Sequence, residues 1–168
     1  MPSVLTRLVC ALAVMLCAGL SGTQLLRYLD WAEYADFADD LAEGRFVPSD
    51  LEALAPVLAR TELHCLTLRE TPLLSLHFYA VDLRAQQADM HPFLPADDPA
   101  LQAQRDRTRA MLEEALACAP LDGNLWLSMA ILSRAQAAPP DLVARHVALS
   151  RLYAPHEGWI ADRRAEFF

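Results

Sequence analysis

The most apolar part of the chain lies near its N-terminus. The 19 residues between Arg7 and Arg27 carry no charge. As a helix they would extend about 28 Å, close to the hydrocarbon thickness of a bilayer. The strongly apolar part ends at Leu20, and that shorter run also suits a secretory signal peptide. We expect residues 1–26 to form an uncleaved single-span anchor; the alternatives are a cleaved signal peptide and a lipoprotein modified at Cys17.

The next segment, residues 27–44, has the pattern of an amphipathic helix. One side of a 3.6-residue wheel is apolar and aromatic. The other side carries six acids and no base between residues 30 and 43. Tyr28 and Trp31 are aromatic residues of the kind found at membrane interfaces. We expect the membrane helix to continue as an acidic stem, and the charge of Arg7 favours a periplasmic location for the rest of the chain.

Beyond the stem, prolines divide helically spaced apolar positions into short helices. Residues 45–90 are predicted to form the N-terminal helical part of the soluble domain, and His77 is expected to be a core or interface histidine. Three prolines make residues 91–99 a connector or, alternatively, a binding loop. A helix capped by Asp97 or Asp98 then opens a helical region over residues 100–168. The other predicted helices are 51–60 (bent or split by Pro56), 61–70, 72–88, 124–137, 140–153 and 156–167.

The composition agrees with an all-α fold. Leu and Ala together supply 59 of the 168 residues, and both favour helices. Ile occurs only at positions 131 and 160. This scarcity of β-branched residues excludes a β-sandwich and argues against a doubly wound α/β fold. The predicted architecture is therefore an N-terminal membrane helix with an amphipathic stem, followed by a small helical bundle.

The charge pattern argues against binding to nucleic acid. The net charge is −8, and all 14 basic residues are arginines. A phosphate backbone requires a basic face, but the one basic run, at Arg105, Arg107 and Arg109, is interrupted by an acid. This run is predicted to be a solvated helix face with i,i+4 pairs such as Arg109–Glu113.

The four cysteines fall into two pairs. Cys10 and Cys17 lie in the apolar segment, whereas Cys65 and Cys118 lie in the predicted soluble domain. Two cysteines of an exported domain can form one disulfide, so a Cys65–Cys118 bond is predicted. The alternative is two buried free cysteines. His64 has no second clustered pair of ligands around it, so a zinc site is not predicted.

A short motif recurs 35 residues apart in the C-terminal region. Ala119-Pro120 and Ala154-Pro155 each follow a predicted helix and precede a turn and a tryptophan, in the strings APLDGNLW and APHEGW. A period near 34 made of two antiparallel helices is the mark of tetratricopeptide (TPR) repeats. Residues 100–168 therefore resemble that family, with one full unit and partial flanks. The matching positions are Leu112, Ala115, Trp126 and Ala130, and the departures are Ser133 and Val143.

The segment Leu112–Arg164 also resembles small proteins of α-proteobacteria that are associated with exopolysaccharide or O-antigen gene clusters. The segment contains the strings ALACAPLDGNLW and LSRLYAPHEGWIADRR. The resemblance implies an accessory role in surface-polysaccharide production. It assigns no catalytic residue.

Together these patterns favour a membrane-anchored periplasmic interaction or accessory protein of the bacterial inner membrane. Its expected partner is an inner-membrane protein complex, and residues 8–26 would contact lipid. One alternative is a structural subunit of another inner-membrane assembly or secretion complex. The other is an envelope glycan-acting enzyme, but nucleophile, phosphate-binding and metal motifs are missing, and no catalytic residue, metal or cofactor is predicted. The predicted partner surface comprises Arg134, Arg145, Arg151 and Trp159.

Overall fold

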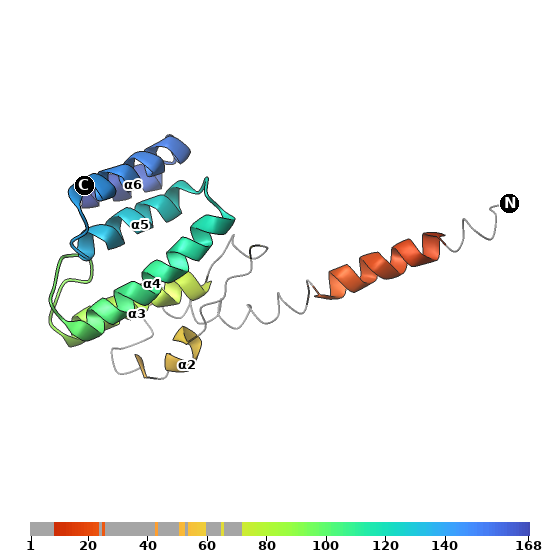
Figure 1. Cartoon of the computed structure of the whole chain (residues 1–168), viewed down its shortest axis with the longest axis horizontal. Helices are drawn as coiled ribbons and strands as arrows, with labels where there is room; N and C mark the ends of the chain where they lie inside the picture. Colours follow the sequence, from red (N-terminus) through yellow and green to blue (C-terminus); the bar gives the residue numbers. More distant parts are fainter. Residues whose placement is uncertain are drawn as a thin grey trace.

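The computed structural model describes residues 9–23, 25, 43, 51, 52, 54–59, 65 and 72–168, and within these ranges the chain is all-α, without strands. Residues 9–23 are helical with exposed side chains, and they lie at the N-terminal end of the molecule in Figure 1. In the described part of the chain, no helix is both long enough and apolar enough to cross a membrane. Nearly all of the predicted stem, residues 27–44, lies outside the described residues, so the anchor and stem stay predictions.

The first labelled helix, α2 (Ala55–Leu58), is shorter than the helix predicted for residues 51–60. Pro56 lies in its first turn, the part of a helix where a missing backbone N–H breaks no intrahelical bond. The predicted helix at 61–70 lies outside the described residues apart from Cys65. Three leucines hold α2 and the turn before it against the next helix; the buried cluster is Leu51, Leu54, Leu58, Leu76, Ala80 and Leu83.

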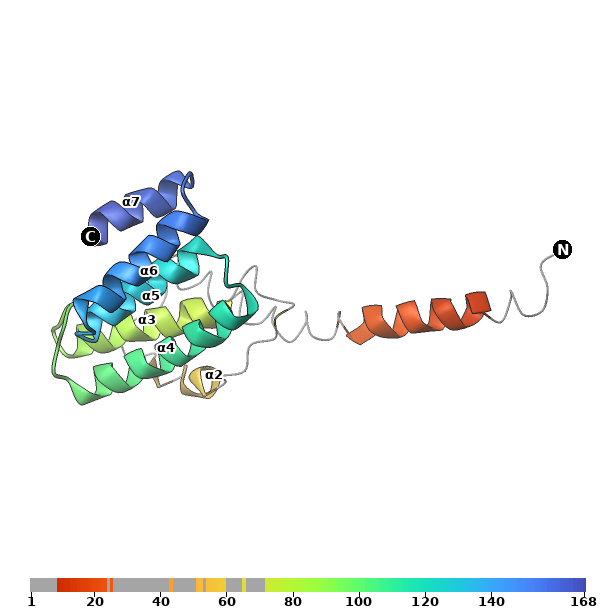
Figure 2. The same ribbon diagram turned by 45° about the horizontal axis from the view of Figure 1, so that its top comes forward.

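Helices α3 (Pro72–Gln87) and α4 (Pro99–Cys118) form an antiparallel pair (Figures 1 and 2). Asp98 is the residue that caps α4, because its Oδ1 accepts a hydrogen bond from the Leu101 N–H at 2.7 Å. His77 of α3 is fully buried, as predicted for a core histidine, and its backbone carbonyl accepts a bond from Thr108 Oγ1 at 3.3 Å. Four side chains of α4 that face the core are Thr108, Met111, Leu112 and Ala115.

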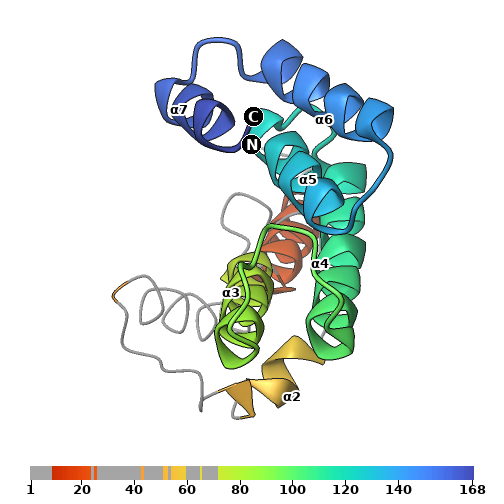
Figure 3. The ribbon, with the colours of Figure 1, turned by 90° about the vertical axis from the view of Figure 1, so that its left-hand side faces the viewer.

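Three further helices complete the stack: α5 (Gly123–Ala135), α6 (Pro140–Tyr153) and α7 (Gly158–Phe167). Helix α5 packs on α4 and pairs closely with α6, whereas α7 packs on α5 (Figure 3). The boundaries agree within two residues with the three helices predicted for this region. A core cluster formed by α3, α4 and α5 joins the two pairs: Leu73, Leu74, Met111, Leu112, Ala115, Leu116, Leu125, Met129 and Leu132.

The sequence motif that recurs after 35 residues corresponds to a recurring backbone turn. Ala119 ends α4 with φ and ψ of −130° and 66°, and Ala154 ends α6 with −133° and 61°. The residues that precede α5 and α7 are also alike, since Asp122 has φ −81° and ψ 107° and Glu157 has φ −81° and ψ 98°. The two turns therefore join successive helices with nearly the same backbone conformation.

The two tryptophans do not occupy equivalent positions in this repeat. Trp126 is the sixth residue after its proline, whereas Trp159 is the fourth. Trp126 is half-buried against the core, and its indole N–H donates to the Pro120 carbonyl at 2.8 Å. The side chain of Trp159 is 54% exposed.

The equivalent glycines of the two turns should respond differently to a methyl group. A Cβ at Gly123 would lie only 2.8 Å from the backbone nitrogen of Ala154, whereas a Cβ at Gly158 would meet nothing within 4 Å. Because the backbone of Ala154 cannot shift without strain, we expect Gly123→Ala to lower the free energy of unfolding by about 1–3 kcal/mol. Gly158→Ala is the matched control and should lower it by less than about 0.5 kcal/mol. Urea unfolding followed by circular dichroism measures both, and equal losses would refute the close packing of α5 on the end of α6.

Candidate docking groove

A groove of about 710 Å³ lies between α6 and Phe168, the residue that follows α7. One face of α6 supplies most of it, since positions 140, 144 and 148 and positions 143, 147 and 151 recur at helical i,i+4 spacing. The other walls come from the end of α5 and from Phe168. The groove is lined by Arg134, Ala138, Pro140, Val143, Ala144, Val147, Ala148, Arg151 and Phe168.

Two arginines give the apolar groove a positive charge. Arg134 Nη1 donates to the Phe167 carbonyl, and the guanidinium lies 5.7 Å from the centre of the Phe168 ring. Arg151 is exposed and makes no hydrogen bond or ion pair with any other described residue. None of the lining residues is acidic. The groove thus combines an apolar floor with two arginines and no lining Asp or Glu side chain.

The four residues of the predicted partner surface do not lie together in the structure. Arg134 and Arg151 come together in the groove. Arg145 lies outside it. Its positive charge, like that of Arg109, helps to lower the pKa of His146. Trp159 is exposed at the start of α7 and does not line the groove. The apolar lining of α6 was missed at the sequence level, although the i,i+4 recurrence of Val143 and Val147 was visible there.

The prediction that the basic run of α4 is a solvated face is wrong for Arg105, which has no exposed surface. Its guanidinium donates only to backbone carbonyls, with Nη1 2.9 Å from the Ala135 oxygen and Nη2 2.7 Å from both the Pro92 and Leu94 oxygens. Nη2 also lies 3.3 Å from the His91 oxygen. Burial lowers the pKa of Arg105 from its ordinary value.

The Arg109–Glu113 pair of the same run is confirmed, at 3.1 Å. Both side chains are substantially exposed, so the pair contributes little to stability. The two arginines of one helix thus differ in burial: Arg105 has no exposed surface, whereas Arg109 is partly exposed and also donates to Gln136 Oε1 at 3.3 Å.

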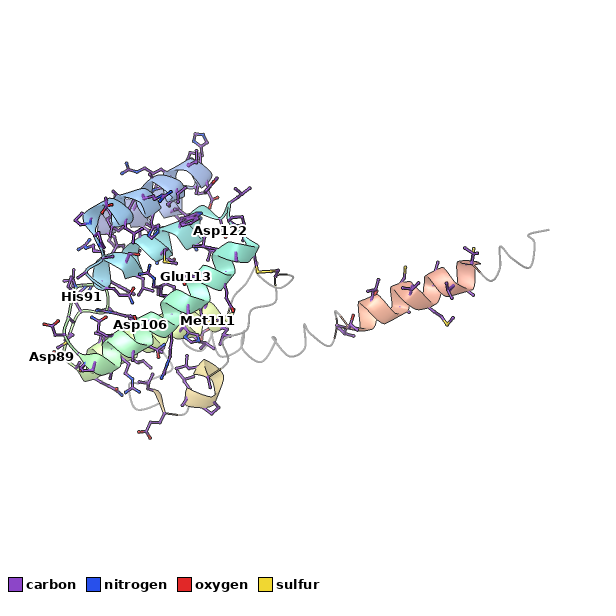
Figure 4. The ribbon with its side chains drawn as sticks, viewed as in Figure 1. Asp89, His91, Asp106, Met111, Glu113 and Asp122 are labelled. Carbon is purple, nitrogen blue, oxygen red and sulfur yellow. A yellow bond between two sulfur atoms is a disulfide. The ribbon has the colours of Figure 1, made fainter. Side chains whose placement is uncertain are left out.

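The predicted connector packs against the helices at the end of the stack where α4 begins (Figure 4). Figure 4 shows Asp89 and His91 at the end of α4 opposite Asp122. Phe93 follows, and its ring lies 6.4 Å from that of Phe78 and 5.9 Å from that of Phe167. Together with Arg105, these contacts tie the loop to α3, α4, α5 and α7. The segment therefore has the structure of a packed connector.

A second buried arginine closes the end of α6. Arg164 Nη1 donates to the Ser150 carbonyl and to Ser150 Oγ, both at 3.1 Å, and Nη2 donates to the Ala154 carbonyl at 3.1 Å. The last carbonyls of a helix carry partial negative charge, and most of them have no intrahelical partner. A planar guanidinium can satisfy several of them at once.

Ser133 and His146 form the one serine–histidine contact among the described residues, with Ser133 Oγ 3.3 Å from His146 Nδ1. Burial, reinforced by the charges of Arg109 and Arg145, holds the pKa of His146 below its ordinary value. Ser133 itself has no exposed surface. The contact therefore joins α5 to α6 inside the core. Within the described ranges, no three potential metal ligands gather in one place.

The predicted disulfide is confirmed. Cys65 and Cys118 are bonded, with their Cα atoms 5.1 Å apart. Figure 4 shows this bond in yellow near the end of α4 that leads to Asp122. Cys10 and Cys17 are free and exposed.

In comparisons with known proteins, no family model, no curated protein and no solved structure matches the chain.

Proposed function

We propose that this chain is a membrane-tethered docking protein, whose helical domain binds another protein through the groove on α6. The observation that supports this most directly is the groove itself, because apolar lining with a few convergent polar groups is typical of binding sites. Its exposed alanines, Ala144 and Ala148, allow close approach of another helix. Grooves of this kind bind the apolar face of an amphipathic helix.

The arrangement of the helices supports a TPR-like module. Consecutive antiparallel pairs joined by a turn that recurs after 35 residues are expected of such repeats. Repeat modules bind partners on surfaces formed by adjacent helices. The groove along α6, with walls from the end of α5 and from Phe168, is a surface of this type.

The disulfide supports an exported location, because such bonds persist in oxidising compartments. The proposed location is the periplasmic side of the bacterial inner membrane, with residues 8–26 as the anchor. The proposed setting, an accessory role beside an inner-membrane complex of surface-polysaccharide production, depends on the sequence resemblance of residues 112–164.

Site-specific photo-crosslinking in cells tests the docking function. A photoreactive phenylalanine analogue at Ala148 would lie in the groove, and the same group at Ala110, which is exposed on α4, is the control. We expect a protein–protein product from the Ala148 variant and none from the Ala110 variant. Enrichment of a polysaccharide polymerase, ligase or exporter among the products would support the proposed setting. Absence of any protein product at Ala148 would refute the docking function.

A further inference from the structure

The two helices that follow the recurring turn differ in how closely their first residue is packed. The start of α5 at Gly123 is covered by the end of α6, because a Cβ there would collide with Ala154. At the equivalent start of α7, a Cβ on Gly158 would meet nothing within 4 Å. Within the described residues, no segment packs on the start of α7 at Gly158 as closely as α6 packs on Gly123. The groove lies along α6, and Phe168, the residue after α7, forms part of its wall.

The groove has the dimensions of a short helix. Its lining on α6 extends from Pro140 to Arg151, which is about 16 Å of helix at 1.5 Å per residue. A helix of about three turns would cover that length. The small side chains of Ala144 and Ala148 leave space for such a helix to approach, while Val143 and Val147 offer apolar surface to its inner face.

The charge of the groove selects an acidic occupant. Arg134 and Arg151 line it, and no Asp or Glu side chain does. Residues 30–43 of this chain contain six acids and no base, and the net charge of the whole chain is −8. The same segment carries an apolar stripe whose members Trp31 and Leu41 would be about 15 Å apart in a helix. Its length, apolar side and charge all complement the groove.

We propose that the groove binds the acidic segment of residues 28–43 from a second copy of this chain. This inference rests on the proposed docking function and names its partner. Within one chain, only residues 44–50 link the segment to Leu51, which packs on α3, and they would have to pass α4 and α5 to reach the groove. Two copies anchored in the same bilayer would instead present segment and groove to each other at high effective concentration. Reciprocal exchange of the segments would give a two-fold symmetric dimer.

The test uses the full chain in lipid nanodiscs that hold two copies with different affinity tags. A photoreactive phenylalanine analogue replaces Ala148 in one tagged copy only. We expect a product that contains both tags, and mass spectrometry should map the attachment in the other copy to residues 28–43. A synthetic peptide of residues 27–44 should compete for the groove, and the same peptide with its six acids changed to Asn or Gln should not.

Two charge reversals on α6 provide a matched pair. Arg151→Glu places an acid in the groove and should lower the yield of the two-tag product at least fivefold. Arg145→Glu makes the same change on the same helix outside the groove and should change the yield less than twofold. Circular dichroism and the melting temperature of both variants report whether the fold is retained.

The outcomes separate this inference from the docking function on which it rests. A two-tag product at residues 28–43 that is lost selectively in Arg151→Glu supports the inference. A product at another region of the second copy or with a different protein would overturn it and leave the docking function standing. A product only within one copy would overturn both, because the groove would then be occupied by its own chain. The absence of protein products at Ala148, both in nanodiscs and in cells, would overturn both.

Discussion

Replacing Arg105 with Met is expected to lower the free energy of unfolding by about 3–5 kcal/mol. Met is similar in length to Arg and apolar, so the change removes hydrogen bonds while keeping most of the packing. Four carbonyls, those of His91, Pro92, Leu94 and Ala135, would lose a donor. A buried polar group without a partner costs about 1–3 kcal/mol, and the loop held by this side chain would detach from the end of α5.

Urea unfolding of the full chain in detergent, followed by circular dichroism, measures this loss. Arg107→Met is the control, because Arg107 lies on the same helix and is exposed; its effect should stay within about 0.5 kcal/mol. Arg105→Lys should be intermediate, since an ammonium group offers three donors without the planar fork of a guanidinium. A loss below about 1 kcal/mol for Arg105→Met would show that the loop is not held by this side chain.

Removing the disulfide should have an effect of similar size. Cys65 and Cys118 are separated by 53 positions, and a cross-link that closes a loop of this length stabilises the folded state by about 4 kcal/mol in the chain-entropy model. We expect the Cys65→Ser, Cys118→Ser double variant to lose about this amount relative to the oxidised protein. Its unfolding midpoint in urea, compared with that of the oxidised and reduced parent, measures the effect.

The other two cysteines supply the control for this experiment. Cys10→Ser, Cys17→Ser should unfold with the midpoint of the parent, because both cysteines are free and exposed. Alkylation of the unfolded protein should label only these two without reductant and all four after reduction. Full labelling of Cys65 and Cys118 in material isolated without reductant would contradict the bond.

The boundaries of α3, α4, α6 and α7 could be predicted because local chemistry sets them. Proline tolerates the first turn of a helix and opposes a helix interior, and Asp98 caps α4 through a neighbour three residues away. The disulfide could be predicted for a different reason. Only two cysteines lie outside the apolar segment, which leaves one possible pairing.

The surroundings of the individual arginines could not be predicted from the sequence. Arg105, Arg145 and Arg151 all occur on predicted amphipathic helices, but their surroundings come from segments distant in the chain. Arg105 is buried because the loop at 91–94 and the end of α5 converge on it. Arg151 lies in the groove and Arg145 outside it because the packing of α6 on α5 fixes which side of α6 faces the C-terminus of the chain.

The sequence by itself therefore determined the all-α class, most helix boundaries and the disulfide, since propensity, capping and cysteine pairing act over short distances or leave few choices. Only the tertiary structure decided which charges are buried and where a concave surface forms. Burial and concavity depend on how far helices diverge: α7 packs on α5 while leaving α6 partly uncovered. That divergence is set by side-chain packing across the whole stack, which local patterns do not encode.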